Sequence, residues 1–70
     1  MSLQLEEIQP GWKVIDASGE ELGTVIGVDR DVIRVQRRGL TGGEWRVPRD
    51  SISEVETGRV EIRLTKNDLS

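Results

Sequence analysis

The chain has 70 residues, a net charge of −3 and neither Cys nor His. A chain of this length forms one domain with a small core, and the missing Cys and His exclude disulfides and the usual zinc ligands. Val and Ile supply 14 of its apolar residues. Because β-branched side chains fit strands better than helices, we expect a single all-β domain over residues 1–70.

Five or six short strands are predicted from apolar alternation and from turns containing Gly, Pro, Asp or Ser. In chain order they cover residues 12–15, 22–29, 32–38, 44–47, 52–56 and 59–64, where 52–56 is either a strand or a half-helical corner. Residues 1–9 form a lead-in whose Leu3, Leu5 and Ile8 can pack against one end of the fold. Residues 65–70 are interpreted as a capped helical turn or tail.

Two glycines, Gly23 and Gly27, interrupt the second predicted strand. Interior glycines in a strand mark a bulge, a sharp bend or a close backbone approach, and a sheet that closes on itself needs all three. Closure also removes exposed sheet edges. We therefore predict a small closed antiparallel β-barrel.

The turn and core residues resemble those of the PRC-barrel family over residues 8–69. The likeness is carried by Ile8-x-Pro10-Gly11-x-x-Val14, Asp16-x-x-Gly19-Glu20-x-x-Gly23-x-Val25, Val47-Pro48, Ile52 and the terminal alternating strand. The chain is similar to the short stand-alone bacterial and archaeal members. The resemblance implies a six-stranded antiparallel barrel that serves as a docking or assembly module and has no common catalytic residue.

A shorter part of the same hairpin also resembles the KOW motif of ribosomal and transcription-elongation proteins. This likeness rests on Pro10-Gly11-x-x-Val14 followed by Gly23-x-Val25. It implies contact with RNA. The turn between these segments is acidic here, whereas basic residues commonly flank the glycine turn of that motif.

The charges are unevenly distributed along the chain. Residues 30–49 hold six Arg and two acids, whereas the segments on either side are acidic. If the third and fourth strands pair, Arg34, Arg38 and Arg46 lie on one outer face, where guanidinium groups can bind carboxylates or phosphates. With the adaptable loop 39–43 beside them, the candidate partner-binding residues are Arg34, Arg38, Arg46, Arg49 and Trp45.

This arginine-rich surface has three interpretations: a solvated sheet face, a site for an acidic protein partner, or a site for nucleic acid. Trp45 alternates inward as a core or rim residue, so no aromatic side chain is left there to stack on bases. The domain is also acidic overall, unlike most nucleic-acid readers. We therefore expect a protein-interaction or assembly module that forms a homodimer or another homo-oligomer, with RNA or ribosome binding as the alternative.

Catalytic, metal and cofactor sites are not expected. The remaining acid–base groups are carboxylates, Lys13 and Lys66, and the carboxylates fall mostly in turns or on outward positions. The segment Asp16-x-Ser18-x-Glu20-Glu21 lacks the spacing of a calcium loop, and Asp and Ser in such a turn normally bond their own backbone.

The same composition predicts a cytoplasmic protein that does not enter the membrane. No apolar run approaches the roughly 20 residues of a membrane span. Residues 1–7 lack the basic and apolar regions of a signal peptide.

Overall fold

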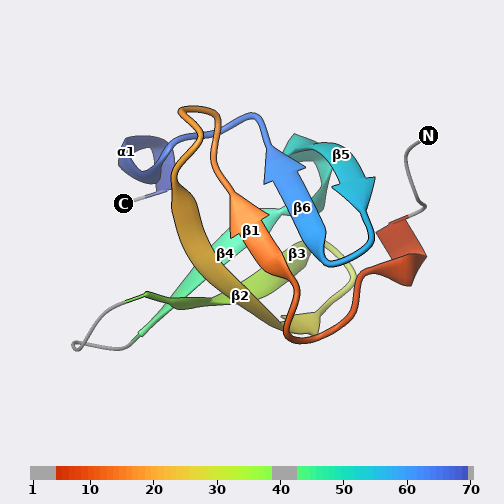
Figure 1. Cartoon of the computed structure of the whole chain (residues 1–70). Coiled ribbons are helices and arrows are strands. Elements are labelled where there is room, and N and C mark those ends of the chain that lie inside the picture. Colours follow the sequence, from red (N-terminus) through yellow and green to blue (C-terminus); the bar gives the residue numbers. More distant parts are fainter. Residues whose placement is uncertain (1–4, 39–42, 70) are drawn as a thin grey trace.

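A computed structural model describes residues 5–38 and 43–69. Six strands form one sheet in this part of the chain, with two single-turn 3₁₀ helices and one short α-helix (Figure 1). The elements are η1 (Leu5–Glu7), β1 (Lys13–Ile15), β2 (Glu21–Val28), β3 (Val32–Arg37), β4 (Glu44–Pro48), η2 (Arg49–Ser51), β5 (Ile52–Glu56), β6 (Arg59–Ile62) and α1 (Lys66–Leu69). The all-β fold class predicted from the sequence is confirmed.

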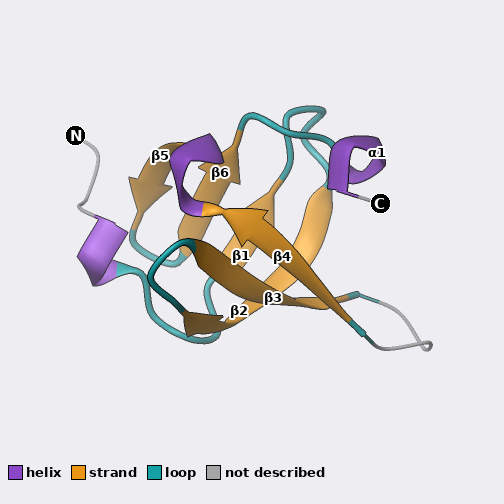
Figure 2. Ribbon diagram, turned by 180° about the vertical axis from the view of Figure 1, so that it is seen from behind, coloured by secondary structure: helices purple, strands orange, loops and turns teal. Residues whose placement is uncertain are grey.

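The sheet is open, so the predicted closed barrel is not confirmed. Its strand order is β4-β3-β2-β1-β6-β5, which leaves β4 and β5 at the two ends. The strands curl around the core without pairing these two ends (Figure 2). The expectation of purely antiparallel pairing is wrong as well, because β1 and β6 run parallel.

Both departures have one cause, the direction of the chain at η2. Hairpins reverse the chain from β1 through β4, and β5 and β6 are also antiparallel. Since β6 runs parallel to β1, β5 has the same direction as β4 within the sheet. Parallel neighbours need a crossover of about a dozen residues. The η2 corner, Arg49–Ser51, has three, so β4 and β5 cannot pair with each other.

Hydrogen bonds hold the η2 corner to both halves of the sheet. The Ser51 hydroxyl donates to the Pro48 carbonyl at 2.6 Å, and the Arg63 amide donates to the Ser51 carbonyl at 2.7 Å. The Arg49 amide donates to the backbone carbonyl oxygen of Asp31 at 2.9 Å. Of the two interpretations for residues 52–56, the strand is confirmed, and the helical turn precedes it.

The core lies on the concave side of the curled sheet and consists almost entirely of aliphatic side chains. Its buried members are Ile8, Val14, Leu22, Val25, Ile33, Val35, Trp45, Val47, Val55, Val60 and Ile62. Trp12 and Leu69 pack against this cluster while partly exposed. Ile8 therefore packs as the sequence predicts; Leu3 and the side chain of Leu5 lie outside what the structure describes. No helix in the described ranges is long and apolar enough to cross a membrane.

The two glycines of β2 permit close contact with β3. A Cβ on Gly23 would overlap the carbonyl oxygen of Gln36, and one on Gly27 would meet the Arg34 guanidinium. The β2–β3 register shifts between Val25 and Gly27, which marks a bulge. Bulges bend and twist a strand. The prediction that these glycines mark a bulge and a close backbone approach is confirmed.

We expect the substitution Gly23→Ala to destabilise the fold by about 1–3 kcal/mol, because the new methyl group must displace backbone rather than a flexible side chain. Urea unfolding followed by tryptophan fluorescence measures the loss. Gly58→Ala is the matched control: Gly58 also has a positive φ, +82°, but a Cβ there meets no atom within 4 Å. Equal losses of unfolding free energy in the two variants would show that the close contact between β2 and β3 is not the reason why Gly23 is required.

Candidate functional site

Arg34 and Arg46 face each other across β3 and β4, as the alternation predicts. Their Cα atoms are partners in the antiparallel ladder. The Arg34 side chain lies across Gly27, and its Nε is 3.1 Å from the Asp29 carboxylate. Arg46 is exposed and has no ion pair within the described ranges. We call the outer surface formed by Arg34 and Arg46 the basic face.

Arg49, another of the four predicted site arginines, forms contacts within the fold. Its guanidinium donates to the carbonyl oxygens of Arg30 at 3.1 Å and Asp29 at 3.4 Å. These contacts hold the η2 corner to the turn between β2 and β3. The guanidinium therefore already has acceptors within the chain, and the prediction that Arg49 binds a partner gains no support from this geometry.

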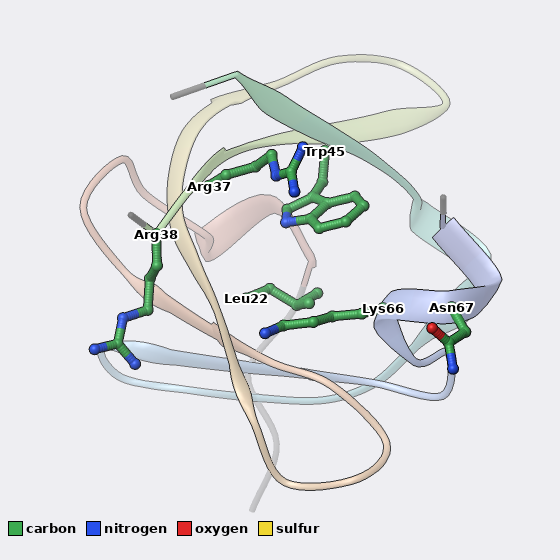
Figure 3. Close-up of a pocket in the computed structure, with 6 residues that line it drawn as sticks. All are labelled: Leu22, Arg37, Arg38, Trp45, Lys66 and Asn67. Carbon is green, nitrogen blue, oxygen red and sulfur yellow. The ribbon is translucent and has the colours of Figure 1, made fainter. Parts of the chain in front are cut away.

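Arg38 lies beyond the end of β3, so the strand register that pairs Arg34 with Arg46 does not extend to it. The last residue of β3 is Arg37, and the Arg38 amide donates to the Leu22 carbonyl at 3.3 Å beyond that strand end. Arg38 instead lines a pocket of about 260 Å³ together with Trp45. The other lining residues are Leu22, Arg37, Lys66 and Asn67 (Figure 3). Loop residues 39–42, also predicted as part of the surface, lie outside the described residues.

Trp45 is 9% exposed, which agrees with its inward alternation. The Arg37 guanidinium carbon lies 4.4 Å from the centre of the indole ring, a cation–π distance. One face of the ring is therefore covered by a cation of the same chain. This arrangement leaves that face closed to a nucleic-acid base.

Arg37 and Lys66 also line this pocket, although neither is predicted as a site residue from the sequence. An arginine within a strand carries no evident signal of a pocket. Lys66 is far from Arg38 in the chain, and only the packing of α1 beside β4 brings the two into one pocket. Arg37 lies two residues beyond Val35, the ladder partner of Trp45, and this diagonal position brings its guanidinium over the indole.

A second charged surface lies at the other end of the sheet, on β5 and β6. The carboxylate oxygens of Glu54, Glu56 and Glu61 lie within 4.8 Å of one another. Glu54 and Glu61 are cross-strand partners, and Glu61 also pairs with Arg59 at 3.3 Å. We call Glu54, Glu56 and Glu61 the acidic face. The sequence analysis did not single it out, because its acids alternate with apolar residues as in any half-buried strand.

Asp16 connects the first hairpin to the C-terminal helix. Its Oδ1 accepts hydrogen bonds from the Ser18 amide at 2.9 Å, the Ser18 hydroxyl at 2.7 Å and the Glu20 amide at 2.9 Å. Its Oδ2 accepts from the Lys66 amide at 3.2 Å. Both carboxylate oxygens therefore accept from the chain itself, in agreement with the prediction that this turn bonds its own backbone.

Burial raises the pKa of Asp16, but the hydrogen bonds from Ser18, Glu20 and Lys66 lower it by more. The resulting pKa lies below the ordinary value of 3.8. A carboxylate with a lowered pKa stabilises the fold above its unfolded pKa, and this contribution is lost as the pH falls through the folded one. Asp16 thus makes the domain sensitive to acid.

We expect Asp16→Asn to lower stability at neutral pH by about 1–3 kcal/mol, because an amide is a weaker acceptor than a carboxylate in these part-buried hydrogen bonds. The difference from the wild type should shrink as the pH falls below 3.8. Urea unfolding at a series of pH values measures both effects. Glu44→Gln, at an exposed position on β4, is the control, and a difference that stays constant with pH would contradict the assignment.

The fold and its charged surfaces define a small all-β domain with an open, curled sheet whose two ends carry opposite charges. The chain belongs to the family DUF2171, described as "Uncharacterized protein conserved in bacteria", whose model matches residues 8–70. Neither a PRC-barrel nor a KOW model matches, so those two resemblances are unconfirmed. A comparison with curated proteins finds no match.

Proposed function

We propose that this protein is a non-catalytic interaction module that associates with further copies of itself. In this association the basic face and β4 of one copy contact the acidic face and β5 of another. One observation carries the proposal: like charges oppose each other across neighbouring strands at both ends of the sheet, with opposite signs. The pairs are Arg34–Arg46 on β3 and β4, and Glu54–Glu61 on β5 and β6.

The electrostatics of a single copy support this proposal. Like charges directly opposite in a sheet are unfavourable, each pair by up to about 1 kcal/mol. On the basic face, Asp29 offsets the charge of Arg34. On the acidic face, Arg59 offsets the charge of Glu61. Arg46 and Glu54 have no ion pair within the described ranges. Contact between the two faces of different copies would place each of them beside an opposite charge.

The backbone supports the same contact. β4 and β5 are end strands, and the direction of the η2 corner prevents them from pairing with each other. An end strand presents unpaired amide and carbonyl groups that can add a strand from another chain. Pairing of β4 with β5 of a second copy would extend the sheet and align the charged faces.

The finer features predicted from the sequence belong to this proposal. The curled sheet is an opened relative of the PRC-barrel architecture, and its role is docking or assembly in the cytoplasm. The competing function is RNA binding by the arginines, which rests on the exposure of Arg46 and Arg38. The cover that Arg37 forms over Trp45 favours a protein partner, because it closes one ring face to base stacking.

Charge reversal on one face should abolish association without harming the fold. Arg46→Glu places a carboxylate opposite Arg34, and Glu54→Lys places an ammonium opposite Glu61, so each variant removes an unfavourable pair within its own chain. We expect either change to weaken self-association at least about tenfold. Thermal stability should be equal to the wild type or slightly higher. Analytical ultracentrifugation and calorimetry measure the two properties.

The decisive sample is an equimolar mixture of the two variants. Neither associates alone, but the reversed face of each is complementary to a face of the other, so the mixture should regain the wild-type sedimentation. Lys13→Glu, the same charge change on the central strand β1, should leave association unchanged. A wild-type protein that stays monomeric at millimolar concentration would refute self-association. Salt-dependent binding of RNA by that monomer would support the competing function.

A further inference from the structure

The pocket between β3, β4 and α1 is cationic, although the chain as a whole is acidic. Arg37 and Arg38 approach it from the end of β3, and Lys66 approaches it from α1. In Figure 3 the Lys66 side chain runs past Leu22 toward the side on which Arg38 lies. Three cations from two segments far apart in the chain therefore line one pocket.

The wall between these cations is apolar. Leu22 is 1% exposed and Trp45 9% exposed, and both line the pocket. The lower dielectric beside buried apolar groups strengthens a charge-assisted hydrogen bond formed there. A bound anion would thus meet cationic donors at the rim and an indole edge and a leucine at the base.

The cations are available to a ligand. The Arg38 side chain has no ion pair within the described ranges. Lys66 pairs with Glu20 at 3.4 Å, but both side chains are about half exposed or more, and such a surface pair contributes little. Arg37 is positioned by the indole rather than by a carboxylate. Its charge is held in place without being neutralised.

We infer that this pocket binds a small organic anion with two acidic groups and an apolar body. Arg38 would bind one carboxylate or phosphate group with its planar fork, and the Lys66 ammonium would bind the other. The apolar body would lie against Trp45 and Leu22. This site is separate from the basic and acidic faces, so the inference does not depend on self-association.

The dimensions agree with a ligand of this class. Ligand pockets commonly enclose about 300–1,000 Å³, so a volume of about 260 Å³, just below this range, suits only a small ligand. A single aromatic or aliphatic body with two acidic substituents fits this space. A longer chain, such as a peptide or an oligonucleotide, would have to leave most of its length outside.

The fluorescence of Trp45 reports binding directly in a Trp12→Phe background. Phthalate and 2-carboxyphenyl phosphate are the probes: both carry two acidic groups on one aromatic ring, and the second has a phosphate monoester in place of one carboxylate. Inorganic phosphate at equal ionic strength tests charge alone. We expect a saturable change with phthalate or carboxyphenyl phosphate and weaker binding of inorganic phosphate. The preferred probe identifies whether carboxylate or phosphate is recognised.

Variants locate the site. Arg38→Gln and Lys66→Gln should each weaken binding about tenfold, the loss of one charge-assisted hydrogen bond. Glu20→Gln should strengthen binding slightly, because it removes a negative charge that lies 3.4 Å from the Lys66 ammonium and repels an anion. A merely structural role for Lys66 would not produce that gain. Arg46→Gln, on the basic face, should have no effect.

Three results would overturn the inference. One is the absence of a saturable signal with either organic probe. Another is inorganic phosphate binding as tightly as both organic probes, which would show that the pocket attracts charge alone. The third is equal weakening by Arg46→Gln and Arg38→Gln, which would indicate a diffuse surface effect.

Discussion

The whole architecture depends on a corner that bends the chain without reversing its direction. Because η2 has three residues, β5 leaves it in the direction in which β4 arrived, and the two strands end up at opposite ends of the sheet. The parallel pairing of β6 with β1 follows from the same corner. Ser51 and Arg49 hold this bend through hydrogen bonds to Pro48 and to the β2–β3 turn. The open ends, with their separated charges, are thus a consequence of topology.

Much of the secondary structure could be predicted from the sequence, because it is encoded locally. Alternating apolar residues locate the strands, and Gly23 and Gly27 reveal the bulge and the close approach in β2. Closure of the sheet could not be predicted in the same way. It depends on whether residues 49–51 reverse the chain, and the pattern of apolar residues is the same in either direction. The expectation of a closed antiparallel barrel failed at this point.

The positions of the candidate site residues were predictable where the register of paired strands decides which side chains share a face. Arg34 and Arg46 face each other because both alternate outward on paired strands. For Arg38 alternation does not decide the direction of the side chain, because β3 ends one residue before it. Lys66 reaches the same pocket only through packing of a distant helix, a tertiary contact with no local signal. Charge composition alone also could not distinguish Arg49 from the exposed arginines. The guanidinium of Arg49 donates to backbone carbonyls of the β2–β3 turn.

The bond between Asp16 and Lys66 has a consequence for the order in which the domain assembles. Its partners are 50 residues apart, so it joins nearly the two ends of the chain. Closing so long a loop costs conformational entropy, and contacts of high sequence separation slow folding. The hairpins can form before this bond, whereas α1 gains its anchor only after the β1–β2 turn is in place. The C-terminal helix is therefore the segment expected to dock last and to detach first in native-state fluctuations.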